Sequence, residues 1–212
     1  MTDPYWNHNV HYHRVVLDAV PEGCAEALDV GCGDGLLARK LAMKAGSVTA
    51  VDRSPAMIRT ARDQTQGLAN VRLLEADYLD DPRLVEGAYD FVTAVATVHH
   101  TDFEEAIRRL QRLPAPGGRL MIVGMAFNRT PLDWVISGAG VPASRFNALL
   151  RGGNRAPAGM PIEDTAMSWG EARRAASRLL PGSRFRRRLL WRYSLVWDKP
   201  EERDKTEEGG GP

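Results

Sequence analysis

The sequence predicts an α/β fold built on a doubly wound, mostly parallel β-sheet. Strand-like apolar runs alternate along the chain with segments of helical periodicity, which is the pattern of this fold class. A glycine-rich turn joins the first predicted strand to the first predicted helix, and the second predicted strand ends on an acidic residue, Asp52. The turn and the acidic residue together predict a strand, loop and helix that bind a nucleoside.

The glycine-rich turn reads LDVGCGDG over residues 28–35. Residues 26–30 can form a short buried strand before the turn, and a helix begins at Leu36 after it. Glycine is needed here because the backbone bends sharply and a ligand approaches it closely. The glycines alternate with single residues and lack the G-x-G-x-x-G spacing of dinucleotide-binding loops, which argues against NAD.

Later segments continue the alternation of strands and helices. The apolar residues of the segment from Phe103 to Leu113 recur at intervals of three and four, so an amphipathic helix is expected there. The run from Pro114 to Gly118 ends that helix and precedes a strand at residues 119–125. Further strand-like runs are expected at residues 47–52, 71–78, 89–100 with the exit loop included, and 191–197.

A capping box marks the start of a helix near the C-terminus. Ser168 and Glu171 stand three residues apart, as the reciprocal hydrogen bonds of that motif require. The helix is expected to present alanines and Leu179 on one face, and Pro181 and Gly182 should stop it.

The glycine turn, Asp52 and the runs at 71–78 and 89–100 follow one another in a fixed order. In that order they resemble the cofactor motifs of class I S-adenosylmethionine-dependent methyltransferases. The resemblance implies a Rossmann-like sheet of seven strands, with residues 191–197 as its antiparallel last strand and residues 184–190 beside it. It implies S-adenosylmethionine as the cofactor and S-adenosylhomocysteine as its product, with no metal.

The resemblance also assigns roles to residues. Asp29, Gly31 and Gly33 are expected to hold the methionine part of the cofactor, and Asp52 the ribose hydroxyls. Three further side chains are expected to contact the adenine: Arg53, Asp77 and Tyr78. Ala96 and Thr97 are expected to line the path between the cofactor and the methyl acceptor.

The 212 residues suit one methyltransferase domain over residues 1–200, followed by a disordered, charged tail at 201–212. Two segments do not belong to the common sheet and are expected to shape the substrate site. Residues 1–20 form a lid or a packing helix, and residues 126–167 form a substrate cap or a mobile surface loop. The expected substrate contacts in these segments are Tyr5, Trp6, His8, His11 and Trp134.

His99 and His100 follow the fourth predicted strand and are the catalytic candidates. Histidine titrates near neutral pH, so either residue can act as a general base, with a hydrogen-bonded structural role as the alternative. A zinc site is not expected, because adjacent side chains should point in different directions and no cysteine pair accompanies them.

Composition and charge indicate which partners and which cellular location to expect. The formal net charge of +1 gives no global attraction to nucleic acid or to a membrane. No apolar run approaches the roughly 20 residues of a membrane span, and no secretory signal begins the chain, so a cytoplasmic location is expected. Cys24 and Cys32 are not expected to form a disulfide. The protein is expected to be a monomer or a homodimer.

The favoured function is methyl transfer to an oxygen, nitrogen or carbon atom of a small metabolite. The run Ala96-Thr97-Val98 lacks the Asn/Asp-Pro-Pro-aromatic pattern of the family's amino-directed nucleic-acid enzymes. The family's metal-dependent catechol-type members need carboxylates around the exit loop, and only Asp102 is near it, which argues against them. One alternative is an RNA methyltransferase that uses the arginines of the C-terminal third, although nucleic acid is not the favoured partner. The other is an NAD(P)-dependent oxidoreductase, which the glycine spacing disfavours.

Overall fold

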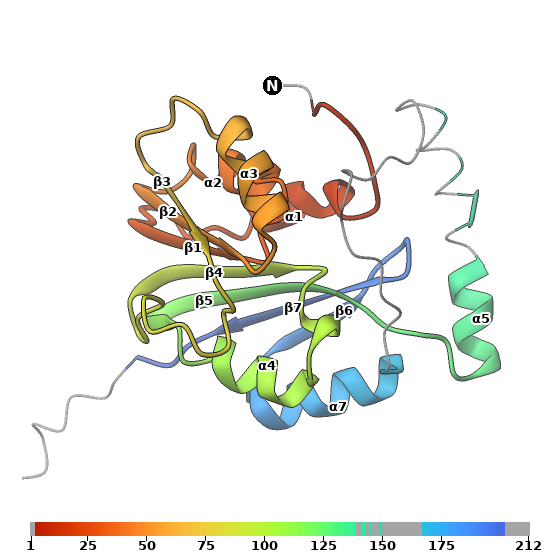
Figure 1. Cartoon of the computed structure of the whole chain (residues 1–212). Helices are drawn as coiled ribbons and strands as arrows, with labels where there is room; N and C mark the ends of the chain where they lie inside the picture. The colour runs from red at the N-terminus through yellow and green to blue at the C-terminus, as the bar shows by residue number, and fades with distance from the viewer. Residues whose placement is uncertain (1–2, 139–140, 143–144, 146–148, 150–166, 202–212) are drawn as a thin grey trace, which may run out of the picture.

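The computed structural model describes residues 3–138, 141–142, 145, 149 and 167–201. A seven-stranded sheet forms its centre, in the order β3-β2-β1-β4-β5-β7-β6 (Figure 1). Strands β1 to β5 pair in parallel, whereas β7 pairs antiparallel with both β5 and β6. The strand bounds are β1 Glu26–Val30, β2 Ser47–Asp52, β3 Val71–Glu75, β4 Tyr89–Val95, β5 Pro114–Met125, β6 Arg184–Arg187 and β7 Arg192–Asp198.

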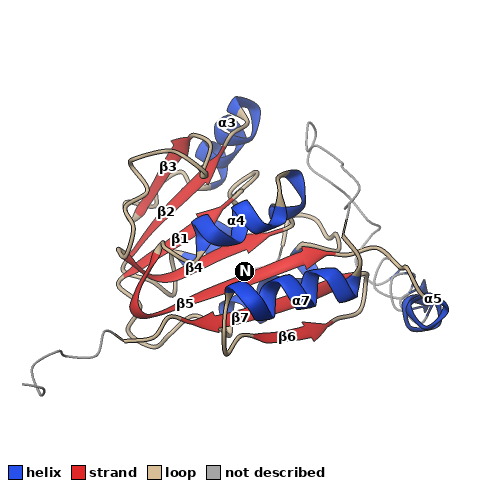
Figure 2. Ribbon diagram, turned by 90° about the horizontal axis from the view of Figure 1, so that it is seen from below, coloured by secondary structure: helices blue, strands red, loops and turns tan. Residues whose placement is uncertain are grey.

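Helices cover both faces of this sheet, as expected for a doubly wound fold. Helices α1, α2 and α3 lie on one face, and α4 and α7 lie side by side on the other (Figures 1 and 2). Helix α5 stands away from the sheet, beyond the carboxyl end of β5 (Figure 1). The helical bounds are η1 Val10–Tyr12, α1 His13–Leu17, α2 Leu36–Leu41, α3 Pro55–Gln64, η2 Val98–His100, α4 Phe103–Leu110, α5 Pro131–Gly138 and α7 Trp169–Leu179.

Two apolar cores hold these layers together. The buried face of α4, which includes Ile107 and Leu110, packs with Ala172 and Ala176 of α7 on one side of the sheet. Leu37, Leu41, Ile58 and Val16 belong to the core on the other side. The predicted helical periodicity of α4 and the predicted capping box of α7 are both confirmed.

The strand order places a ligand-binding edge at the centre of the sheet. Strand β1 pairs with β2 on one side and with β4 on the other, so the chain reverses its winding direction between β1 and β4. In open α/β sheets, ligands bind outside the carboxyl ends of the strands at this switch point. The glycine turn follows β1 and His99 and His100 follow β4, so both lie at that edge.

Several predicted boundaries are wrong. Strand β5 begins at Pro114, because Pro114 pairs with Tyr89 and because Gly117 and Gly118 exchange backbone hydrogen bonds with Lys199. Strand β6 ends at Arg187 instead of residue 190. Leu190 and Trp191 each have a φ of 56°, which turns the chain, so β7 begins only at Arg192.

Two predicted helices are shorter than expected. Helix α4 ends at Leu110, three residues before the predicted end. Near the N-terminus, α1 ends at Leu17 and does not continue to Val20. Most of the insertion, which comprises residues 126–167 and is the predicted substrate cap or surface loop, lies outside the described residues, as does the tail at 202–212. Among the helices that the structure describes, none is long and apolar enough to cross a membrane.

Candidate functional site

The glycine turn packs against the exit of β4. Gly31 has a φ of 68°, and a Cβ atom built on it would overlap Oγ1 of Thr97 and lie 2.9 Å from Cβ of Thr97. The amides of Gly31 and Cys32 both donate to the carbonyl of Val51, at 2.8 and 3.0 Å. The turn therefore follows a path that only glycine can take at position 31.

The carboxylate of Asp52 connects the glycine turn to the end of β2. Its two oxygens accept hydrogen bonds from the amides of Gly33 and Ser54, at 2.9 and 2.8 Å. Each carboxylate oxygen has more than one acceptor position, so Asp52 keeps acceptor capacity for hydroxyl donors of a ligand. The predicted residues Gly31, Gly33 and Asp52 thus lie together.

Asp29, Asp34 and Asp52 bring three carboxylates to the same region. Asp29 is 1% exposed, and its Oδ2 atom is buried without a hydrogen-bond partner. Burial, with the nearby charges of Asp52 and Asp34, raises the pKa of Asp29 to about 7. A buried, unsatisfied carboxylate oxygen beside two further acids is suited to a cationic group such as the ammonium of S-adenosylmethionine. These residues fit that cofactor.

Ala96 and Thr97 form the corner where β4 ends. Ala96 has a φ of 54°, which is uncommon for a residue with a side chain, and its amide donates to the carbonyl of Val123 at 2.8 Å. The hydroxyl of Thr97 donates to the carbonyl of Val30 at 3.0 Å. A strained corner held by neighbouring strands is typical of functional sites.

The residues predicted around the adenine are more dispersed. Arg53 and Asp77 are exposed, and Oδ1 of Asp77 accepts from the amide of Leu79 at 3.0 Å. Tyr78 lies in the core, with its hydroxyl 3.2 Å from Oγ1 of Thr101. Burial raises the pKa of Tyr78, so its hydroxyl stays protonated at neutral pH.

The N-terminal segment, residues 3–17, crosses the glycine turn. The hydroxyl of Tyr5 donates to Oδ2 of Asp34 at 2.9 Å. Nζ of Lys40 on α2 lies 2.5 Å from a carboxylate oxygen of Asp3 and 3.2 Å from Nδ1 of His13. Burial and the charge of Lys40 lower the pKa of His13 to about 3, so this histidine is neutral. These contacts fix one end of the segment on the predicted cofactor loop.

The other end of the N-terminal segment contacts the turn between β6 and β7. Trp6 is 2% exposed, and its ring centroid lies 5.7 Å from that of His8 and 6.2 Å from that of His11. The ring of His8 in turn lies 5.6 Å from that of Trp191. The hydroxyl of Tyr12 donates to the carbonyl of Leu189 at 2.5 Å. The structure thus brings together three of the predicted substrate contacts.

Trp134, the remaining predicted substrate contact, lies apart from that aromatic group. It is 67% exposed on α5. The neighbouring Asp133 anchors α5 through an ion pair with Arg187 of β6, at 2.7 Å. The guanidinium of Arg187 also lies 4.1 Å from the ring centroid of Trp169 on α7. Helix α5 is thereby tied to β6 and α7 at the start of the insertion.

His99 and His100 lie in the short helix η2, directly after the corner of Ala96 and Thr97. Their ring centroids are 4.0 Å apart with an interplanar angle of 37°. The expectation that their side chains point in different directions is therefore wrong, because the two rings lie alongside each other. Asp102, the nearby acid, caps α4 by accepting from the amide of Glu105.

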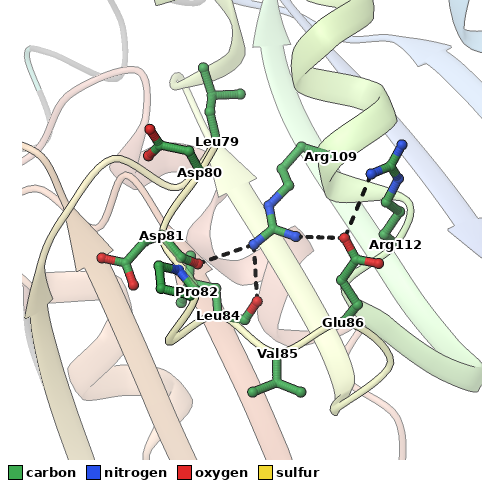
Figure 3. Close-up of a pocket in the computed structure, with 9 residues that line it drawn as sticks. All are labelled: Leu79, Asp80, Asp81, Pro82, Leu84, Val85, Glu86, Arg109 and Arg112. Carbon is green, nitrogen blue, oxygen red and sulfur yellow. Dashed lines mark hydrogen bonds and ion pairs between the residues drawn. The ribbon is translucent and has the colours of Figure 1, made fainter.

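A hollow of about 460 Å³ lies elsewhere, between the segment from Leu79 to Glu86 and helix α4 (Figure 3). Arg109 holds this segment by donating to the carbonyls of Tyr78, Asp81 and Leu84. It also pairs with Glu86 at 3.0 Å. Arg109 thereby fixes the connection between β3 and β4. None of the predicted site residues lines the hollow.

Three residues of this edge were not among the predicted site residues. Asp34 stands within the glycine turn, where its acidic character is visible in the sequence. Trp191 and Arg192 reach the N-terminal segment only because the chain turns at Leu190. Arg192 donates to Oδ1 of Asn9 at 2.9 and 3.2 Å, a contact between residues 183 positions apart that no local pattern reveals.

Comparison with known sequences identifies relatives over most of the chain. Residues 27–118 match the model of a methyltransferase domain. The chain is 35% identical to uncharacterized methyltransferases of Mycobacterium bovis and Mycobacterium tuberculosis, over 93% of this chain and 99% of each relative. It is 34% identical over 122 residues to a ubiquinone biosynthesis O-methyltransferase of Xanthomonas oryzae, a match that covers 55% of this chain and 48% of that protein.

Solved structures share the fold. The N-methyltransferase NodS of Bradyrhizobium japonicum, in complex with S-adenosylhomocysteine, superposes with a TM-score of 0.63 at 14% identity, over 92% of this chain and 89% of that chain. A SAM-dependent methyltransferase of Aquifex aeolicus gives a TM-score of 0.57 at 19% identity, over 87% of this chain and 88% of that chain. With the sequence relatives, the seven-stranded sheet and the carboxylates around the glycine turn, the chain belongs to the class I S-adenosylmethionine-dependent methyltransferases.

Proposed function

We propose that this enzyme transfers the methyl group of S-adenosylmethionine to an oxygen, nitrogen or carbon atom of a small-molecule acceptor. The observation that carries the proposal is the group of Asp29, Asp34 and Asp52 around the glycine turn, in which Oδ2 of Asp29 is buried without a partner. The partial match to a protein named for O-methylation in ubiquinone biosynthesis supports a small acceptor.

We infer that each part of the cofactor has its own side chains. Asp29, Gly31 and Gly33 hold the methionine part, and Asp52 accepts from the ribose hydroxyls. Asp77 accepts from the adenine amino group, with Arg53 beside the ring and Tyr78 behind it. When bound, the cofactor supplies a methyl group that is electrophilic because it is attached to a sulfonium. The residues need to align the acceptor with that group and to exclude water.

In this proposal, the corner after β4 and the N-terminal segment align the acceptor with the methyl group. Ala96 and Thr97 line the path between cofactor and acceptor. The N-terminal segment acts as a lid, because Tyr5 fixes it to the glycine turn and Tyr12 fixes it to the β6–β7 turn. His99 and His100 flank the acceptor, either as a base or as positioning groups.

The RNA alternative is weaker. Three arginines of the C-terminal third are already paired with carboxylates of this chain: Arg178 with Glu104, Arg184 with Asp198 and Arg187 with Asp133. Paired arginines on different elements do not form the continuous basic stripe that nucleic-acid binding uses.

Calorimetry and a transfer assay test the proposal. S-adenosylhomocysteine should bind to the purified chain, and NAD should not. Cofactor carrying a labelled methyl group should then label a small molecule in a metabolite extract, as read by mass spectrometry. Binding without transfer to any small molecule, but with label on added RNA, would favour the alternative.

A further inference from the structure

The turn between β6 and β7 has an unusual backbone. Leu190 and Trp191 both have a φ of 56°, although neither is glycine. This left-handed region is sterically unfavourable for a residue that carries a side chain. The amide of Arg188 donates to the carbonyl of Arg192 at 2.7 Å, which closes the turn. Strain of this kind persists where the surrounding structure requires it, and here it sets the positions of Trp191 and Arg192.

Arg192 carries a buried positive charge without an acidic neighbour. It is 8% exposed, and its guanidinium donates to Oδ1 of Asn9 and, at 3.3 Å, to the carbonyl of Leu190. Both acceptors are neutral, and Arg192 makes no ion pair with the residues that the structure describes. Burial lowers the pKa of Arg192 to about 10, which leaves it charged at neutral pH. A buried charge normally has a charged partner.

Arg188 adds a second cation beside it. Its Nε atom donates to the hydroxyl of Ser194 at 2.9 Å, and within the described part of the chain this neutral group is the one hydrogen-bond partner of the Arg188 side chain. The charges of Arg188 and Arg192 both act on Tyr12, whose pKa burial raises and these two cations lower. Arg184 and Arg187 of the same hairpin, in contrast, each have a carboxylate partner.

The two cations lie at the edge where the acceptor is expected. Arg192 stands opposite Met125 in the ladder between β5 and β7, and β4 is the next strand beyond β5. Neighbouring strands are about 4.8 Å apart, so the backbone of Arg192 lies roughly 10 Å from the end of β4. A small molecule spans that distance. The rings of His8 and Trp191 stand beside the same turn, with their centroids 5.6 Å apart.

We propose that the methyl acceptor carries an ionised oxyacid group, which Arg188 binds directly while Arg192 contributes its charge from behind. This inference rests on the proposed methyl transfer and names the class of its acceptor. A guanidinium binds a carboxylate through two parallel hydrogen bonds, which suits recognition of such a group. Arg188 and Arg192 are therefore specificity-determining residues of the acceptor site.

The test separates acceptors by charge before the reaction. A metabolite extract is passed over an anion exchanger at pH 7, and the retained and unretained fractions are each incubated with enzyme and labelled cofactor. We expect label only in the retained fraction. Rechromatography of the active fraction at pH 3 then distinguishes carboxylates, which lose their charge, from phosphates and sulfonates, which keep it.

Variants connect the charge preference to the two residues. Arg188→Gln should lower labelling at limiting acceptor by about 10- to 100-fold, the range for a charge-assisted hydrogen bond. Arg192→Gln removes only the charge behind that contact, so it should also lower labelling, but by less than Arg188→Gln. The affinity for S-adenosylhomocysteine should stay unchanged in both variants. Arg192→Lys keeps the charge and should retain much of the labelling, which controls for a buried residue whose loss disturbs folding. Arg173→Gln removes an exposed charge on α7 and should have no effect.

Each other outcome overturns a specific statement. Label confined to the unretained fraction, or an equal loss in Arg173→Gln, overturns the acidic acceptor and leaves methyl transfer intact. Cofactor binding without label in either fraction overturns the proposed small-molecule function itself.

Discussion

The side chain of Thr97 fills the space beside Gly31 that a Cβ atom would need. Its hydroxyl donates to the carbonyls of Val30 and Val95, at 3.0 and 3.2 Å, and the positive φ of the preceding Ala96 fixes its direction. The exit of β4 and the glycine turn after β1 therefore depend on each other. A change at either position should be felt at the cofactor site.

Gly31→Ala tests this dependence. The new methyl group would meet both the positive φ and the Thr97 side chain, so the variant should lose stability and cofactor binding. Gly67→Ala is the matched control, because its φ is 83° but nothing lies within 4 Å of the added atom. In urea unfolding the control should lose about 1–2 kcal/mol from its backbone alone. A loss at Gly31 no larger than this would contradict the close packing.

Asp52→Asn removes one acceptor site for the ribose and weakens the bond to the amide of Gly33. The affinity for S-adenosylhomocysteine should fall by about 1.5–3 kcal/mol, the range for hydrogen bonds that involve a charge. Asp63→Asn, an exposed change on α3, should leave calorimetric binding unchanged. Equal affinities in the two folded variants would remove Asp52 from the cofactor site.

The raised pKa of Asp29 predicts a pH dependence of cofactor binding. The carboxylate must be ionised to accept an ammonium group, and its pKa is raised to about 7 in the free protein. Affinity should therefore rise between pH 6 and pH 8, by about tenfold in total, because the ionised fraction grows over this range. Calorimetry of Asp29→Asn with S-adenosylhomocysteine should show weaker binding and no such rise. A wild-type affinity that is flat with pH would contradict this role.

The free energy of unfolding of the free protein should fall as the pH rises, in the opposite direction to the affinity for the cofactor. A carboxyl group with a higher pKa in the folded state than in the unfolded state binds more protons when folded. The free protein should therefore lose stability as the pH rises from about 4 through 7, over the range between the ordinary and the raised pKa of Asp29. Urea unfolding at pH 6 and pH 8 should show a smaller decline for Asp29→Asn than for the wild type.

Substitutions of two tyrosines should distinguish the roles of the two ends of the N-terminal segment. Tyr5→Phe removes the hydroxyl that binds Asp34, and should raise the dissociation rate of the cofactor about 10-fold or more, because a hydrogen bond to a carboxylate, of about 1.5–3 kcal/mol, is lost from the proposed lid. Tyr12→Phe removes the bond to Leu189, and should mainly raise the KM for the acceptor. Stopped-flow dissociation and steady-state kinetics measure the two effects. Identical profiles for both variants would indicate a packing helix without a lid function.

The local elements around the glycine turn could be predicted from the sequence. The bounds of β1 and β2 and the start of α2 at Leu36 are confirmed, because glycines and a terminal acid delimit short apolar runs there. The antiparallel position of β7 is also confirmed. Local chemistry was sufficient in these places because the residues that set each boundary lie within the element or next to it.

The contacts between the β6–β7 turn and the N-terminal segment could not be predicted in the same way. The turn at Leu190 and Trp191 has positive φ values at residues that do not favour them, and its contacts come from Asn9 and Tyr12 at the other end of the chain. The bond between Tyr5 and Asp34 likewise joins residues 29 positions apart. Such pairs depend on the tertiary arrangement, which a single sequence does not encode in a readable pattern.

Variants of His99 and His100 test whether catalysis depends on proton transfer to a base or only on alignment of the acceptor. Their rings lie 4.0 Å apart at the exit of β4, where the acceptor is expected. A positioned general base contributes about 10²- to 10⁴-fold to the rate. Once an acceptor is known, His99→Ala and His100→Ala should be assayed separately, with the affinity for S-adenosylhomocysteine measured beside the turnover rate.

If one histidine is a base, its variant should lose turnover within that range while cofactor affinity and the unfolding midpoint stay unchanged. A structural histidine should instead lower the midpoint or the cofactor affinity, because its ring supports the corner of Ala96 and Thr97. His99→Gln and His100→Gln serve as matched variants, since glutamine keeps hydrogen-bonding capacity but cannot take up the proton at neutral pH. Recovery of turnover with glutamine would therefore assign a positioning role. Full turnover in both alanine variants would exclude a general base at either residue, and alignment beside the sulfonium would then account for the rate.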